Sequence, residues 1–261
     1  MKILLFGSTG LLGNALQDFL IDKTELVSPL HSTNQGKECD VRNINDIRDV
    51  FKREKPDVCI NTVAISDPSL CEKEPKRCKE LNVGVVKNLI KACKTYKCLL
   101  VCFSTDYIFD GNSNRGYSEE DIPSPLQLYG QTKEKAEKYL QKYENSLIIR
   151  LPFLYGSLNR KTRNDFIKSV IGALKENKNL KINDLQIRYP TFTEDVAEIV
   201  WVLIQKGERG IYHISANDAI TKYQWAKIIA MKVKHPVDCI KKDDKTFDKE
   251  KPINSHLLIN K

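Results

Sequence analysis

Residues 1–13 read Met1-Lys-Ile-Leu-Leu-Phe-Gly-Ser-Thr-Gly-Leu-Leu-Gly13, and this stretch decides the fold. The apolar run from Ile3 to Phe6 is typical of a strand that is buried on both faces of a parallel sheet. Glycines follow at positions 7, 10 and 13, and apolar residues then recur every three or four positions up to Leu20, which predicts a helix with one face against the sheet. Strand, glycine turn and helix are therefore contiguous, as in a Rossmann-type α/β fold with a doubly wound parallel sheet.

The glycine turn has a chemical use as well as a structural one. The first turn of a helix presents unpaired backbone N–H groups and the positive end of the helix dipole, which together bind a pyrophosphate. Gly7 suits the tight turn, Gly10 leaves no side chain between backbone and phosphate, and Gly13 lets the helix pack close to the strand. The alternative is an ordinary strand-to-helix turn, but the sequence context favours a dinucleotide site. We expect its lining to include Gly7, Thr9, Gly10, Leu11, Leu12 and Gly13.

Length and composition exclude several classes of protein. The 261 residues can bury one large core, or one core with a small lobe. No apolar stretch approaches the roughly 20 residues that span a bilayer, so we expect no membrane partner. Met1 leads directly into the first strand without a signal peptide, which predicts a cytoplasmic location.

The cysteine and histidine spacing and the distribution of charge argue against a metal site and against a nucleic-acid partner. The eight cysteines form no C-x-x-C pair and the four histidines no H-x-x-x-H, so no metal site is expected. Several cysteines lie in apolar runs, which predicts reduced thiols packed in the core. The net charge of +8 is spread over lysines interleaved with acids, which predicts no nucleic-acid partner and suits an anionic small ligand.

The region after the second predicted strand, residues 24–27, bears on the choice of nicotinamide cofactor. Residues 28–34 contain no acid to bind the adenosine ribose, which disfavours NAD, and no arginine for a 2′-phosphate. We therefore favour NADP(H) without excluding NAD(H). His31 and Ser32 are candidate ligands, with ordinary loop polarity as the alternative. Asp40, followed by Val41, is placed either to accept from the adenine amino group or to cap a helix that begins near Ile44.

Two further predicted strands deliver polar residues to the same edge of the sheet. The strand within residues 56–65 runs into Asn61–Ala64, which we expect to line the cofactor groove with Asn61, Val63 and Ala64. A helix is predicted over 75–95, and Asn82 on its apolar face is either an edge position or a ligand. The strand over 98–103 ends at Ser104-Thr-Asp-Tyr107.

Tyr129 and Lys133 form a Y-x-x-x-K motif. Positions four apart lie on one helix face, so the phenol and the ammonium can share a small site. A free tyrosine has a pKa near 10, and we expect the nearby cation to lower the pKa of Tyr129. By itself the motif is common on surface helices. It gains weight because it follows the glycine turn and a hydroxyl at a strand end, Thr105.

With these motifs in order, the chain resembles the extended short-chain dehydrogenase/reductase family. Over residues 7–261 it is similar to the dTDP-4-dehydrorhamnose reductase branch, which includes the regulatory β subunit of methionine adenosyltransferase. The stretches that carry the resemblance are Gly7–Gly13, Ser104-Thr-Asp-Tyr-Ile-Phe-Asp-Gly111, Glu119–Leu126, Tyr129-Gly-Gln-Thr-Lys133, Arg150-Leu-Pro-Phe-Leu-Tyr-Gly156, Arg188-Tyr-Pro-Thr191, Asp195-Val-Ala197 and Lys251-Pro-Ile-Asn-Ser255.

The resemblance implies a domain division and residue roles. Residues 1–156 would form the NADP-binding Rossmann domain, and residues 157–261 a small α+β substrate lobe intertwined with it. Thr105, Tyr129 and Lys133 would be the catalytic triad: Tyr129 protonates the substrate carbonyl, Thr105 hydrogen-bonds it, and Lys133 holds the nicotinamide ribose. The substrate pocket would be lined by Asp106, Phe109, Arg150, Tyr155, Arg188 and Thr191, with a strand end and a proline turn as the alternative for the last four.

Two functions in different classes stay open. The first is NADPH-dependent reduction of a nucleotide-linked 4-keto-6-deoxy sugar. The second is an NADP-binding regulatory subunit whose partner is a methionine adenosyltransferase catalytic subunit. Leu151-Pro152 stands where the reductases usually carry small hydroxyl residues, which weakens the first, and the chain ends at Lys261, before the tail that the regulatory subunit uses in docking, which weakens the second. A homodimer is also left open.

Overall fold

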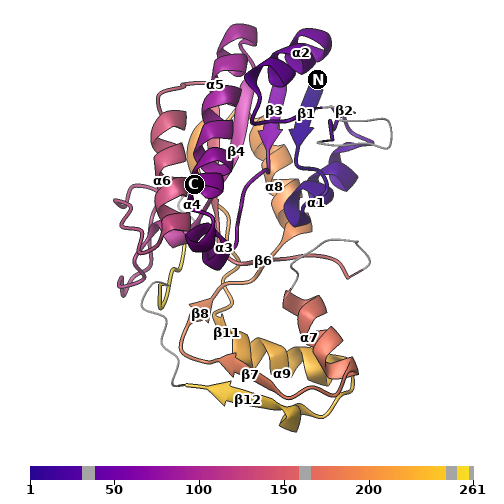
Figure 1. Cartoon of the computed structure of the whole chain (residues 1–261), viewed down its shortest axis with the longest axis vertical. Helices are drawn as coiled ribbons and strands as arrows, with labels where there is room; N and C mark the ends of the chain where they lie inside the picture. Colours follow the sequence, from indigo (N-terminus) through magenta and orange to yellow (C-terminus); the bar gives the residue numbers. More distant parts are fainter. Residues whose placement is uncertain (31–38, 159–165, 245–251, 259–261) are drawn as a thin grey trace.

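The computed structural model describes residues 1–30, 39–158, 166–244 and 252–258. Its main domain is built on a six-stranded parallel sheet with the order β10-β5-β4-β3-β1-β2 (Figure 1). The doubly wound parallel sheet predicted from the sequence is confirmed. Its strands are β1 (Lys2–Phe6), β2 (Glu25–Val27), β3 (Val58–Asn61), β4 (Leu99–Thr105), β5 (Ser146–Leu151) and β10 (Gly210–His213).

Side chains of the central strand β1 alternate between the two faces of the sheet. Ile3 and Leu5 point into one core, Leu4 and Phe6 into the other, and none of the four is more than 1% exposed. Burial on both faces explains why this strand is apolar at successive positions, as parallel strands covered by helices usually are.

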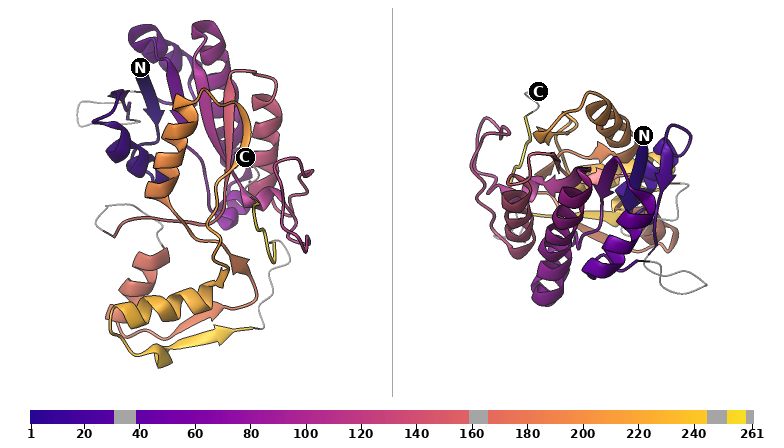
Figure 2. Two further views of the ribbon diagram at one scale, coloured as in Figure 1. Left: turned by 180° about the vertical axis from the view of Figure 1, so that it is seen from behind. Right: turned by 90° about the horizontal axis from the view of Figure 1, so that it is seen from above.

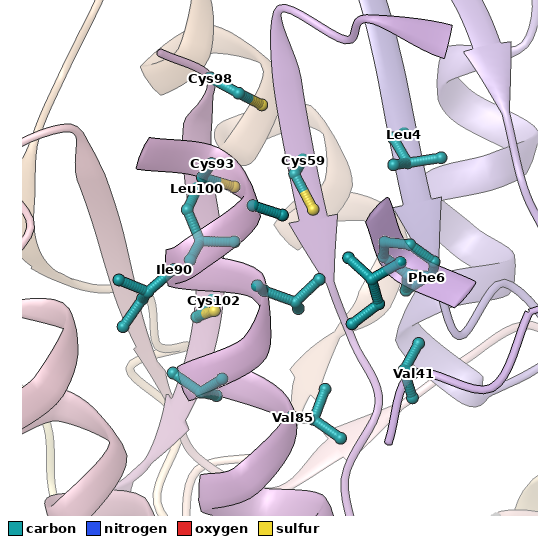
Figure 3. Close-up of a cluster of buried hydrophobic side chains, with 14 of the residues drawn as sticks. Leu4, Phe6, Val41, Cys59, Val85, Ile90, Cys93, Cys98, Leu100 and Cys102 are labelled. Atoms are coloured by element: carbon teal, nitrogen blue, oxygen red, sulfur yellow. The ribbon is translucent and has the colours of Figure 1, made fainter. Parts of the chain in front are cut away.

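Helices cover both faces of the sheet (Figures 1 and 2). One face carries α1 (Leu11–Leu20) and α8 (Thr193–Gln205), and the other carries α2 (Ile44–Glu54), α5 (Val85–Tyr96) and α6 (Leu128–Leu140). Figure 3 shows that cysteines fill the second core beside Leu4, Phe6 and Leu100. All eight cysteines are free thiols and seven are buried, as predicted. Among the described residues, no helix is both long and apolar enough to span a membrane.

The helix predicted over 75–95 is interrupted. It consists of α4 (Pro75–Lys79), a π-helical turn η1 (Glu80–Gly84) and α5, and a further short helix, α3 (Pro68–Lys73), precedes it. Asn82 lies in the π-helical turn, an arrangement that occurs often at functional sites. The turn η2 (Asp106–Ile108) follows β4 directly.

A small lobe lies below the main domain in Figure 1. It contains α7 (Phe166–Lys175), α9 (Lys222–Lys232), the pair β7 (Leu180–Asn183) and β12 (Ile240–Asp243), the pair β8 (Ile187–Arg188) and β11 (Ile220–Thr221), and η3 (Val237–Cys239). The short pair β6 (Leu154–Tyr155) and β9 (Thr191–Phe192) lies between the lobe and the sheet.

The expected division at residue 156 needs a correction. Residues 157–261 contribute α8 and β10 to the main domain as well as forming the lobe. The reason is that β10 completes the main sheet by pairing with β5, and α8 buries Val196, Ala197 and Val200 in the core that also contains α1.

Candidate active site

The chain changes direction in the sheet at β1, because β2 and β3 pair with opposite sides of this strand. Ligands of open α/β sheets bind at the carboxyl ends of the strands at such a switch point. Here the switch point brings the glycine turn after β1 beside the loop 61–65 after β3. The Thr62 hydroxyl joins the two, because it bonds to the carbonyl oxygens of Phe6 at 2.9 Å and Gly7 at 3.0 Å. This loop was expected to line the groove, whereas the role of Thr62 was not predicted from the sequence.

The glycine turn fits a pyrophosphate. Gly7 has a φ of +87°, and a Cβ on Gly13 would lie 2.1 Å from the Gly7 carbonyl oxygen, so the predicted structural roles of both glycines are confirmed. Gly10 caps α1 without any side-chain hydrogen bond, and both Thr9 and Gly10 are exposed. The first amides of α1 are therefore open to an anionic ligand, as the phosphates of NADP(H) require.

The expected adenosine contacts have mixed outcomes. His31 and Ser32 lie outside the described residues. The Asp40 carboxylate accepts from Arg42 Nε at 2.9 Å and Nη2 at 2.7 Å, and Val41 packs into the core. The helix cap that we considered for Asp40 belongs instead to Asn43, which accepts from the backbone N–H of Asn45 at 3.0 Å.

Asn82 is buried and is not an edge residue. It is 2% exposed, accepts from the backbone N–H of Ile65 at 2.8 Å, and donates to the carbonyl oxygen of Ile65 at 3.1 Å and to Thr132 Oγ1 at 3.1 Å. It therefore ties the loop 61–65 to α6. A cavity beside this loop is lined by Asn61, Val63, Asn82, Ser104 and Lys133, among others, so the structure brings these predicted residues together.

The three candidate catalytic residues converge at the carboxyl end of β4. Gln127 caps α6 by accepting from the backbone N–H of Gly130 at 2.7 Å, which starts the helix just before Tyr129. A Cβ on Gly130 would lie 2.1 Å from the carbonyl oxygen of Tyr107, so α6 packs directly on the segment after β4. This close approach places the Tyr129 phenol beside the Thr105 hydroxyl, with which it interacts. Gly130, within Tyr129-Gly-Gln-Thr-Lys133, is the feature of the sequence that could have predicted this contact.

The electrostatics of the phenol differ from the expectation. Burial raises the pKa of Tyr129, and the hydrogen bond with Thr105 opposes this rise only in part. Lys133, one turn further along α6, donates to the carbonyl oxygen of Phe103 at 2.8 Å, and burial lowers the pKa of this lysine. The expected lowering of the phenol pKa is therefore wrong for the protein without ligand, because desolvation outweighs the hydrogen bond with Thr105. The phenol stays protonated at neutral pH, as a proton donor must.

Five of the six residues expected at the substrate pocket are enclosed in the protein. Asp106, Phe109, Arg150, Arg188 and Thr191 are 3%, 0%, 1%, 2% and 4% exposed, respectively. Buried polar groups are stable only with partners, and all four polar members have them. These side chains expose almost no surface in this structure, and their assignment to the substrate pocket stays a prediction.

The partners of these residues come from distant parts of the chain. Arg150 donates to Glu137 at 3.1 and 2.8 Å and to the carbonyl oxygen of Glu119 at 3.1 Å, and its guanidinium lies over Phe109. Arg188 donates to the carbonyl oxygen of Pro252 at 3.0 Å. The hydroxyl of Thr191 accepts from the backbone N–H of Ala216 at 2.9 Å.

Tyr155 alone among the six is partly exposed, and it belongs to an aromatic cluster that joins β6, α7, β9 and α9. Its ring lies 5.2 Å from Phe192 and 5.5 Å from Trp225 between centroids. The ammonium of Lys222 lies 5.0 Å from the ring centre of Phe153. We define the aromatic cluster as Phe153, Tyr155, Phe166, Phe192, Lys222 and Trp225. Apart from Tyr155, the members of this cluster were not predicted from the sequence, because they are spread over 73 positions.

Comparison with known proteins agrees with this geometry. The chain is 31% identical over 236 residues to dTDP-4-dehydrorhamnose reductase of Escherichia coli K12, covering 88% of this chain and 77% of that protein. It is 30% identical over 276 residues to methionine adenosyltransferase 2 subunit beta of Rattus norvegicus, covering 100% of this chain and 81% of that protein. The crystal structure of dTDP-4-dehydrorhamnose reductase from Bacillus anthracis in complex with NADP superposes with a TM-score of 0.90 at 26% identity, covering 99% of this chain and 90% of that one.

The model of the RmlD substrate binding domain matches residues 1–261. This match spans the glycine turn, the converging Thr105, Tyr129 and Lys133, and the small lobe. The chain therefore belongs to the RmlD substrate-binding-domain family.

Proposed function

We propose that this protein is an NADPH-dependent reductase of a nucleotide-linked 4-keto-6-deoxy sugar. The observation that carries the proposal is a protonated phenol, Tyr129, held beside the Thr105 hydroxyl at the edge of the sheet where the glycine turn also lies. The relatives named dTDP-4-dehydrorhamnose reductase support this reaction. An NADP-binding protein without a proton donor would not need this arrangement.

Different residues of the chain would bind the cofactor and transfer the proton. The glycine turn and the loop 61–65 would hold the cofactor, with Lys133 at its ribose; when bound, NADPH supplies the hydride. Tyr129 would give its proton to the substrate carbonyl oxygen, and Thr105 would hydrogen-bond the same oxygen. A neutral phenol suits reduction, since the proton must be present before the carbonyl is reduced.

The aromatic cluster supports a nucleotide-linked substrate. Base rings stack on aromatic side chains, and a lysine attracts a diphosphate. Tyr155, Trp225 and Lys222 offer both features between the sheet and the small lobe. We therefore place the nucleotide portion of the substrate at this cluster. The eight free thiols accord with a reducing, cytoplasmic compartment.

The test is the oxidation of NADPH in the presence of dTDP-4-keto-6-deoxy-mannose, followed by absorbance. Tyr129→Phe should lower kcat by about 10²–10⁴-fold, the range for loss of a general acid, without changing the melting temperature by more than a few degrees. Tyr139→Phe makes the same change further along α6 and should leave kcat intact. Absence of turnover in the wild type would refute the proposal.

The relation to methionine adenosyltransferase 2 subunit beta favours a second candidate function, because that similarity covers the whole chain. In this alternative the chain binds NADP and regulates a methionine adenosyltransferase catalytic subunit without turnover of its own. Mixing the two purified proteins and measuring the mass of the complex by light scattering tests it. The same measurement on the chain alone tests for a homodimer.

A further inference from the structure

Helix α8 carries apolar side chains on the face that points away from the sheet. Ile199 and Val202 are 41% and 40% exposed, whereas Val196, Ala197 and Val200 on the inner face are buried. Figure 2 shows α8 on the outside of the main domain. Residues three and four positions apart share a helix face, so the exposed residues form one continuous row. We define the α8 stripe as Asp195, Glu198, Ile199, Val202, Gln205 and Lys206, which are all exposed.

The apolar surface extends to both sides of the α8 stripe. Trp201 and Leu203 flank it and are only partly buried, and Ile21 is 58% exposed at the end of α1, the other helix on this face of the sheet. In the described chain, α2, α5 and α6 on the opposite face carry no large apolar side chain that is exposed. Single exposed apolar residues are normal, but a group of them on one face is typical of an interaction surface.

The charges of the α8 stripe complement a second copy of it in the reverse direction. Asp195 and Glu198 lie in the first half of the helix, and Lys206 follows its last turn. None of these three residues forms an ion pair within the part of the chain that the structure describes. Glu198 and Lys206 lie four positions before and after Val202. A twofold axis at Val202 would therefore place Glu198 of each copy level with Lys206 of the other.

Other helical surfaces of the chain lack this self-complementarity. The outer faces of α5 and α6 expose the lysines Lys87, Lys91, Lys94, Lys135 and Lys138. A twofold axis on that face would bring like charges together, which is unfavourable. Ile228 and Met231 are exposed on α9, but all the charged residues of that helix are lysines. The α8 stripe differs because unpaired charges of both signs lie on either side of its apolar centre.

We propose that the α8 stripe is the contact surface between two copies of this chain, which pair through antiparallel α8 helices about a twofold axis at Val202. In such an interface every contact occurs twice. Val202 would meet its counterpart, with Ile199 beside it. Trp201 would contribute at the edge, since tryptophan is enriched among the residues that dominate binding energy. The inference does not depend on the reaction proposed above.

The size of this surface sets the expected affinity. The 13 residues of α8 span about 20 Å, so one pair of helices buries less than the roughly 1,600 Å² of a standard interface. We therefore expect a reversible dimer with a Kd of about 10–100 μM.

Sedimentation velocity of the full chain at concentrations up to about 300 μM tests the proposal, because this range exceeds the expected Kd. Val202→Glu should weaken dimerisation at least about tenfold, since two like charges would meet at the axis. Ile228→Glu on α9 is the matched control, with the same change at a side chain that is 41% exposed, and should dimerise like the wild type. Both variants should melt within a few degrees of the wild type, because both positions are exposed.

Charge reversal tests the antiparallel arrangement. Glu198→Lys should raise the Kd of the dimer by about three- to thirtyfold, because each new lysine would lie level with Lys206 of the other copy. Adding Lys206→Glu to this variant should restore most of the wild-type affinity. A double variant that dimerises no better than Glu198→Lys would overturn the antiparallel pairing. The proposal would also be overturned by a wild-type chain that stays monomeric, by a dimer that Val202→Glu leaves intact, or by a mass that grows beyond that of a dimer.

Discussion

Two cationic residues near the carboxyl end of β4, Lys133 and Arg150, show how differently one charge can be used. Lys133 is half-buried and donates to one backbone carbonyl, that of Phe103, which leaves donor capacity for a ligand. Arg150 is 1% exposed, and its donors meet the carboxylate of Glu137 and the carbonyl of Glu119. The first arrangement can bind a ligand and the second stabilises the fold. A charged residue in a family motif therefore does not by itself indicate ligand binding. The number of its N–H donors that have no protein partner is a better indicator.

The largest expected effect tests this comparison directly. Arg150→Met should lower the free energy of unfolding by about 3–5 kcal/mol, because it leaves the carboxylate of Glu137 buried and uncompensated. Arg77→Met is the matched control, since its ion pair with Glu74 is exposed and worth less than about 1 kcal/mol. Urea unfolding of both variants measures the difference. Equal, small losses of unfolding free energy in the two variants would show that Arg150 does not stabilise the fold.

A pH titration of stability tests the same buried network. His213 is 3% exposed, and burial lowers its pKa to about 4. Between this value and the ordinary value near 6.5, the unfolded chain binds a proton that the folded chain does not. Stability should therefore fall as the pH drops from 6.5 to 4, by about 2–3 kcal/mol from this group. In His213→Gln the urea midpoint should lose this part of its pH dependence. If the midpoint of the variant fell with pH as steeply as that of the wild type, a group other than His213 would cause the loss of stability.

Substitution of Gly13 tests the glycine turn, which like Lys133 leaves hydrogen-bond donors for a ligand. In Gly13→Ala the added Cβ would lie 2.1 Å from the Gly7 carbonyl oxygen, so the turn must shift, at a cost of about 1–3 kcal/mol. NADPH affinity should fall at least about tenfold by fluorescence titration, which corresponds to 1.4 kcal/mol. Gly172→Ala in α7 meets no atom within 4 Å and should leave the affinity unchanged. Unaltered binding in Gly13→Ala would mean that the cofactor does not use this turn.

The smallest expected effect concerns the pH dependence of reduction. Because burial raises the pKa of Tyr129 above 10, the phenol stays protonated through the neutral and mildly alkaline range. The kcat for reduction should therefore change less than about twofold between pH 7 and pH 9, with loss of the acid only at higher pH. A decline with an apparent pKa near 7 would indicate that bound ligands lower the phenol pKa, as the sequence analysis expected from Lys133.

Much of the fold and part of the site could be predicted from local sequence. The first strand, the glycine turn and α1 are contiguous, so the periodicity of residues 1–20 was sufficient to place them. Tyr129 and Lys133 share a helix face at positions four apart, and Thr105 ends an apolar strand. The small lobe was expected only from the family resemblance, and its boundary was misplaced because β10 returns to the main sheet.

By itself the sequence determined which elements form and which polar residues lie at the carboxyl edge of the sheet, because both follow from spacing along the chain. Only the tertiary structure decided which of those residues are enclosed. Arg150 is enclosed with Glu137, which lies 13 residues away in the sequence. Asp106 is enclosed with Ser255, which lies 149 residues away. A buried polar group and a binding group can have the same side chain, and the folded chain distinguishes them by whether it supplies a partner or leaves the group for a ligand.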